Sequence, residues 1–68
     1  MNRMTVNSSN IASVGFEAGT LEVEFKSGGI YQYMNVPELI YRSLLAAPSK
    51  GSYFASNIKD RYHTIRIR

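Results

Sequence analysis

The chain contains no cysteine and only one histidine, His63, among its 68 residues. Without cysteine it can form no disulfide, and structural zinc sites, which draw mainly on Cys and His, have too few donors here. We therefore expect no metal and no cofactor. A single core in a chain of this size rarely supplies more than about 3–5 kcal/mol. Association with a protein partner or with a second copy therefore remains open as a source of stability.

Long apolar runs are also missing. No stretch approaches the roughly 18 apolar residues that a membrane-spanning helix needs, so we expect no membrane segment. Residues 1–9 are mostly polar and lack the apolar stretch of a secretory signal. We expect them to form a flexible leader in front of a single domain at residues 10–68, in a cytoplasmic protein.

Charge is distributed unevenly along the chain, whose formal net charge is +3. Residues 1–25 carry one arginine against three glutamates, whereas residues 26–68 carry seven basic residues against two acidic ones. A basic half is typical of proteins that bind an anionic partner such as RNA, because phosphate contacts dominate that affinity. The same charge also fits a solvated surface that keeps a protein in solution.

Strand patterns fill the first half of the chain. The segment Ile11–Phe16 is rich in β-forming residues and predicts a first strand. Residues 21–26 alternate apolar and charged side chains, which predicts a half-buried strand. Its inner face consists of Leu21, Val23 and Phe25. After a Ser-Gly-Gly turn the β pattern returns at residues 30–34, so a second hairpin is expected.

The direction of Tyr31 and Tyr33 depends on the length of that turn, because a shift of one residue moves every side chain to the other face. A two-residue glycine loop would leave both rings on the charged face of the sheet. A three-residue loop at residues 27–29 would place both rings with the core, with Phe25 opposite Tyr31. We favour the three-residue loop, since it also groups Gln32 with the outward-facing glutamates.

Two helices and a final strand are predicted in the second half. Pro37 suits the first position of a helix, because its φ is preset and it has no N–H to lose. The helix face toward the sheet is expected to hold Leu39, Ile40, Leu44 and Ala47. Ser49 is expected to cap a second, shorter helix, whose apolar side consists of Tyr53, Phe54 and Ile58. Residues 61–68 alternate again and predict a closing strand, with one face made of His63, Ile65 and Ile67.

Together these elements predict an α+β fold. We expect a small antiparallel sheet, in the chain order strand, strand, strand, helix, helix, strand, with both helices packed on one face. The predicted core consists of Leu21, Val23, Phe25, Ile40, Leu44, Phe54 and Ile58.

Several short motifs follow one another in a specific order: a Leu-x-Val-x-Phe strand, a Gly-Gly turn, Tyr31-x-Tyr33, Ser49-Lys50-Gly51 and Tyr53-Phe54. From Ser9 to Ile67 their order and spacing resemble the KTSC domain, named for the C-terminal extension of some lysyl-tRNA synthetases and found mostly as a small free-standing bacterial protein. Phe16 stands where the family often has tyrosine, which costs a hydroxyl. The resemblance implies a link to RNA through the attachment to a tRNA-charging enzyme.

A candidate surface for nucleic acid combines cations, which hold phosphates, with aromatic rings, which stack on bases. Its members are Lys50, Gly51, Tyr53, Lys59, Arg61, Tyr62, Arg66 and Arg68. The expected partner is RNA, tRNA-like or otherwise, or a single-stranded nucleic acid. The Ser49-Lys50-Gly51 motif could hold an anion with its backbone N–H groups and its cation, but we favour an ordinary capped helix start. The basic residues could also be scattered, with Tyr53 packed under its helix.

A catalytic apparatus is not predicted. Asp60 and His63 lie three residues apart, so on a strand they would point to opposite faces. Glu22 and Glu24 share a face, but we expect that face to lie in solvent, with no pocket to raise a pKa. The sequence therefore predicts a non-enzymatic binding module. The alternative to nucleic acid is a protein partner or weak homodimer at the open edge of the last strand.

Overall fold

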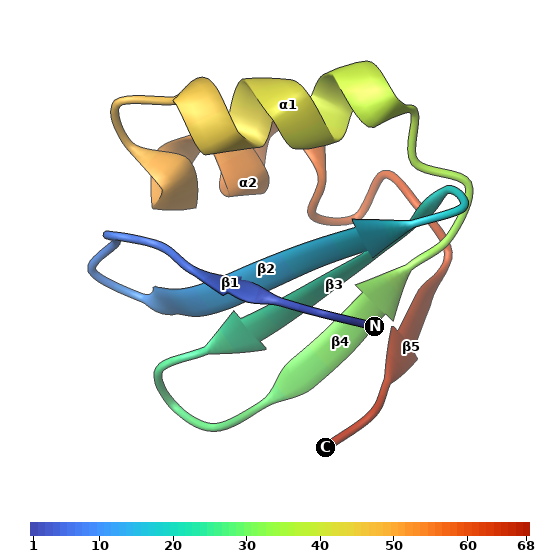
Figure 1. The fold of residues 1–68 in the computed structure, drawn as a ribbon, viewed down its shortest axis with the longest axis horizontal. Coiled ribbons are helices and arrows are strands. Elements are labelled where there is room, and N and C mark those ends of the chain that lie inside the picture. Colours follow the sequence, from blue (N-terminus) through green and yellow to red (C-terminus); the bar gives the residue numbers. More distant parts are fainter.

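A computed structural model describes all 68 residues and shows an antiparallel sheet of five strands with two helices on one of its faces (Figure 1). In chain order the elements are β1 (Met4–Thr5), β2 (Ile11–Glu17), β3 (Thr20–Phe25), β4 (Ile30–Tyr33), α1 (Glu38–Ala46), α2 (Lys50–Asn57) and β5 (Thr64–Arg66). The strands lie in the sheet in the same order as in the chain. This confirms the predicted α+β fold with its helices between the last two strands.

The turn between β3 and β4 has the predicted three residues but begins one residue earlier. Phe25 and Gly29 close it through a backbone hydrogen bond of 2.9 Å from the Phe25 N–H to the Gly29 carbonyl. Gly28, with a φ of 107°, therefore takes the left-handed position that the sequence suggested for Gly29. A glycine suits this position because side chains with a Cβ are strained there.

Both tyrosines of β4 point toward the helices, as the three-residue turn predicted. Their partners on β3 differ from the prediction, because the whole turn lies one residue nearer the N-terminus. Each tyrosine therefore pairs two residues earlier on β3 than predicted: Tyr31 with Val23 and Tyr33 with Leu21. Gln32 lies on the opposite face, beside the glutamates of β3, as expected. The predicted faces of the hairpin are thus correct, while its register is not.

The core lies between the sheet and the two helices. Its buried members are Ile11, Val14, Leu21, Val23, Tyr33, Val36, Leu44, Phe54 and Ile58. Five of the seven predicted core residues are among them, and the other two, Phe25 and Ile40, are half-buried against the cluster.

The face that α1 turns to the sheet differs from the prediction at Leu39, whose exposure is 71%. Positions 39 and 44 are about 140° apart around a helix of 3.6 residues per turn, so both cannot face the sheet. Tyr41 and Leu45 pack against the core instead. α2 begins as predicted: Ser49 is its N-cap, and its hydroxyl accepts a 3.3 Å hydrogen bond from the backbone N–H of Ser52.

Strand β1 was not predicted, because two residues carry no readable alternation. Met4 pairs with Val14 and Thr5 with Ser13, so part of the segment predicted as a leader is a sheet edge. Gly15 allows this approach: a Cβ there would lie 2.5 Å from the backbone carbonyl oxygen of Asn2.

The closing strand exists but is short and exposed. Ile65 pairs with Gln32, which places it on the face without helices, and Ile65 and Ile67 are 41% and 52% exposed. His63 is exposed as well. All three side chains are therefore exposed, and no helix covers the side of β5 on which Ile65 lies. Neither helix is long and apolar enough to cross a membrane.

Candidate functional site

A cleft of about 520 Å³ opens between the sheet and α2. Its apolar lining comes from Phe25, Tyr31 and Tyr33 on the strands and from Phe54 and Ala55 on α2, beside Gly51. Its polar lining consists of Asn10, Ser27, Lys59, Asp60 and Thr64. An apolar cleft with a few convergent polar groups is the usual form of a small-ligand site.

The aromatic rings of the cleft hold one another in edge-to-face contact. Ring centroids are 5.8 Å apart for Phe25 and Tyr31, 5.4 Å for Phe25 and Phe54, and 5.5 Å for Tyr33 and Phe54. Such pairs contribute about 0.5–1.5 kcal/mol beyond the area they bury. These four rings, here called the aromatic cluster, thus form a wall of defined geometry.

Two cations flank this wall. Arg66 lies opposite Tyr31 in the β4–β5 pair, and its guanidinium carbon is 5.6 Å from the centroid of the Tyr31 ring. Lys59 follows the end of α2 and lines the cleft, next to Asp60, which adopts a left-handed φ of 62°. Strand β5 and the turn after α2, both distant from β3 in sequence, therefore bring positive charge to the aromatic cluster.

Tyr33 has its hydroxyl at the cleft, among groups that disfavour its ionisation. Burial, and then the neighbouring Tyr31 and Asp60, raise the pKa of Tyr33 to about 12. The phenol therefore stays protonated at neutral pH and can donate a hydrogen bond to a ligand. It is not suited to act as a general base.

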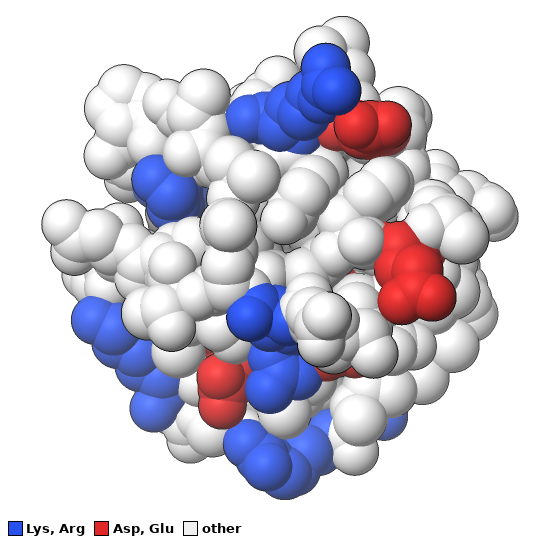
Figure 2. Space-filling model, viewed as in Figure 1, with Lys and Arg blue, Asp and Glu red and all other residues white.

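The predicted nucleic-acid residues do not form one surface. Gly51, Lys59 and Arg66 meet at the cleft together with Tyr31 and Tyr33. The other basic side chains are held elsewhere, and Figure 2 shows the lysines and arginines in separate groups on the face it presents.

Bonds within the chain account for most of the remaining candidates. The Lys50 ammonium donates to the carbonyl of Ala47 at 3.2 Å, and Arg61 Nε donates to the carbonyl of Ser56 at 3.0 Å. Tyr53 and Tyr62 are half-buried against the core. These contacts favour a structural role for Lys50, Tyr53 and Tyr62, whereas Arg61 remains exposed after the end of α2.

The glycine at position 51 is also explained by packing. A Cβ there would lie 2.7 Å from the Asn10 side-chain oxygen, so the glycine lets the end of the first loop approach α2. Together with the Ser49 cap, this supports the interpretation of Ser49-Lys50-Gly51 as a helix start.

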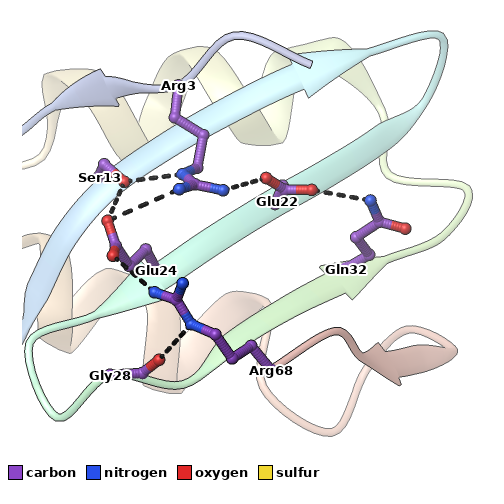
Figure 3. Close-up of polar contacts among 7 residues, drawn as sticks. All are labelled: Arg3, Ser13, Glu22, Glu24, Gly28, Gln32 and Arg68. Carbon is purple, nitrogen blue, oxygen red and sulfur yellow. Dashed lines mark hydrogen bonds and ion pairs between the residues drawn. The ribbon is translucent and has the colours of Figure 1, made fainter.

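The face of the sheet without helices carries a polar network centred on β3 (Figure 3). Arg3 forms an ion pair with Glu22 and donates to the Ser13 hydroxyl at 3.0 Å. On the other side of Glu22, the Gln32 amide donates to its carboxylate at 2.8 Å. No local pattern indicates this role for Arg3, because the residue lies in the segment predicted as a leader.

The same network continues to the C-terminal end of the chain. Ser13 donates to Glu24 at 2.8 Å, and Arg68 donates to Glu24 at 3.4 Å from its guanidinium and to the Gly28 carbonyl at 3.4 Å (Figure 3). Arg68, a predicted nucleic-acid residue, therefore lies on the side of the sheet opposite the aromatic cluster.

Glu22 is only 8% exposed, which corrects the expectation that this carboxylate lies in solvent. The hydrogen bond from Gln32 lowers the pKa of Glu22, with Arg3 adding to the effect and burial opposing it. The carboxylate is thus held ionised and cannot serve as a general acid near neutral pH. No group of three or more His, Cys, Asp or Glu side chains comes together in a way that could hold a metal ion.

These features define a small α+β domain with an up-and-down antiparallel sheet, two helices on one face and an aromatic cleft beneath the second helix. The model of the KTSC domain family matches residues 7–62, and the chain belongs to this family. The resemblance inferred from the motifs is therefore confirmed.

Related proteins are similar over different shares of their length. The crystal structure of a KTSC domain protein from Yersinia pestis covers 98% of this chain and 97% of its own, with a TM-score of 0.94 and 36% identity. An uncharacterised protein of Stutzerimonas stutzeri is 38% identical over 65 residues, which cover 93% of this chain and 92% of that protein. A lysine–tRNA ligase of Nostoc sp. is 49% identical over 43 residues, which are 63% of this chain but 8% of the ligase.

Proposed function

We propose that this domain is a non-enzymatic module that binds RNA or another single-stranded nucleic acid on the cleft side of its sheet. The observation that carries the proposal is the position of two cations, Lys59 and Arg66, beside the aromatic cluster. Proteins that bind single strands combine these two elements, since rings stack on bases while cations contact phosphates. The similarity to a segment of a lysine–tRNA ligase supports RNA as the partner.

Only a few cations contribute to this surface, so the binding should be weak and strongly dependent on salt. Each neutralised phosphate adds about 0.7 to the slope of log affinity against log salt for a single strand. Lys59 and Arg66, with the exposed Arg61 between them in sequence, set an upper limit of about three contacts, or a slope of about two.

The test is a titration of labelled RNA, single-stranded DNA and duplex DNA at low salt, followed by fluorescence anisotropy. Alanine substitution of Lys59, Arg61 and Arg66 together should weaken binding and flatten the salt slope. Arg42→Ala is the matched control, because Arg42 is exposed on α1 and pairs only with Glu38 of the same helix. Absence of binding at tens of micromolar protein, or equal losses in the control, would contradict the proposal.

A second candidate function is protein interaction or self-association at the edge of β5. The Met34 N–H donates to the His63 carbonyl, and the Ile67 N–H donates to the Ile30 carbonyl. The backbone N–H and C=O groups of the odd-numbered residues in this segment therefore point to β4. The backbone groups of Thr64 and Arg66 therefore point to the open edge of the sheet, where another strand can pair. Sedimentation over a wide concentration range tests self-association, and a strict monomer would exclude it.

A further inference from the structure

The cleft offers more than a surface, because it has room for one ring system. We infer that one unstacked base of the bound strand enters it, while the flanking phosphates remain outside with Lys59 and Arg66. This inference rests on the proposed function and makes it more specific. It assigns the aromatic cluster to the base and the two cations to the backbone.

Size is the first argument. The volume of about 520 Å³ lies within the range of about 300–1,000 Å³ that is typical of small-molecule sites. A base with its sugar fits such a space, whereas a stacked duplex does not. A base must therefore leave its stack to enter, as single-stranded loops and ends permit.

The shape of the cleft comes from the pairing of large and small side chains. The strands contribute Phe25, Tyr31 and Tyr33, and α2 contributes Phe54 and the exposed Ala55, whose short side chain leaves space beside the rings. A longer side chain at Ala55 would fill that space. A flat ligand can thus lie against the aromatic rings, beside the short side chain of Ala55.

The polar groups of the cleft favour a base over a phosphate. Asp60 lines the cleft, and its carboxylate repels an anion but accepts hydrogen bonds from the N–H groups of a base. Tyr33 supplies a protonated hydroxyl, and Thr64 and Asn10 can donate or accept. Arg66 lies over the Tyr31 ring, and its exposed guanidinium can still bind a phosphate.

The test fills the cleft without removing any group that contacts phosphate. Ala55→Phe places a ring in the cleft from an exposed position of α2, and Ala46→Phe makes the same change at an exposed position of α1 outside the cleft. A short RNA or single-stranded DNA is titrated with the wild type and with both variants. The second probe is an abasic strand of the same length, and circular dichroism melting checks that each variant folds.

We expect Ala55→Phe to weaken binding of the normal strand on the order of 10-fold with an unchanged salt slope, as expected for the loss of one stacked base. Ala46→Phe should bind like the wild type. The abasic strand should bind the wild type as weakly as the normal strand binds Ala55→Phe. Should Ala55→Phe fail to fold, the comparison of the two strands on the wild type still decides the question.

Two other outcomes separate this inference from the function on which it rests. If normal and abasic strands bind the wild type equally, and Ala55→Phe binds both as the wild type does, the cleft takes no base and the inference is overturned. Nucleic-acid binding through the backbone would stand in that case. If no strand binds at low salt, the proposed function fails, and the inference fails with it.

Discussion

The two faces of the sheet are both ordered by β3, but by different means. On the helix side, Leu21 and Val23 are fully buried under aliphatic and aromatic side chains. On the open side, Glu22 is almost as inaccessible, although no helix covers it, because Arg3 and Gln32 lie across it. The comparison shows that a two-layer domain can bury its central strand on both sides, once with a core and once with paired charges.

The first prediction tests the helix side, where the largest effect is expected. Leu44→Ala removes a fully buried side chain and should lower the free energy of unfolding by about 2–5 kcal/mol, enough to unfold much of so small a domain. Leu39→Ala, on the same helix but 71% exposed, should change it by less than about 0.5 kcal/mol. Urea denaturation of both variants measures the difference, and equal losses would refute the assigned orientation of α1.

The second prediction tests the open side. Glu22→Gln removes the charge that Arg3 faces and should cost about 1–3 kcal/mol at neutral pH. Glu17→Gln, at an exposed glutamate that makes no ion pair, is the control and should cost little.

The effect of Glu22→Gln should depend on pH in a defined direction. Since folding lowers the pKa of Glu22 below 4.5, its charge stabilises the fold fully above that value. The contribution is lost as the pH falls through the lowered pKa. The stability gap between wild type and variant should therefore close on acidification, and a gap that stayed constant would mean that the charge is not what stabilises this face.

The third prediction concerns the edge strand β1, which follows Arg3, and the expected change in stability is the smallest of the three. In Gly15→Ala the new Cβ would collide with the Asn2 carbonyl, so β1 must move away at a cost of about 1 kcal/mol. In a chain that begins at Val6 the obstacle is gone, and the same substitution should be neutral. Thermal melting of all four proteins gives the comparison, and an equal cost in both backgrounds would show that β1 does not cause it.

Local patterns predicted the elements, and long-range contacts decided the rest. The alternation in β3 and the serine cap of α2 could be read from adjacent residues, since each depends on its own segment. Strand β1 depends on pairing with β2, and the burial of Glu22 depends on Arg3, 19 residues away, which no local pattern records. The exposure of Leu39 does follow from the sequence, because helical spacing alone separates it from Leu44.

The candidate site was predicted in part for the same reason. Charge and residue type indicate Lys59 and Arg66, but Arg66 meets Tyr31 only because β5 returns beside β4 after two helices, and Lys59 lines the cleft because it follows the end of α2. Arg68 was named on the same grounds but lies on the other face, since Ile67 and Arg68 both donate to the carbonyl of Ile30 and the alternation is interrupted there. The alternation of residue types along a strand does not show where its side chains switch from one face of the sheet to the other.

The order of the strands in the sheet also bears on how the domain assembles. Strands β1 to β4 pair with their neighbours in sequence through short loops, so these hairpins can form first and quickly. Only the pairing of β4 with β5 must span two helices, and we expect it to form last. If so, β5 is also the segment that detaches most easily from the native state. Local opening of this single strand would then remove Thr64 and Arg66 from the cleft side while the rest of the sheet stays folded.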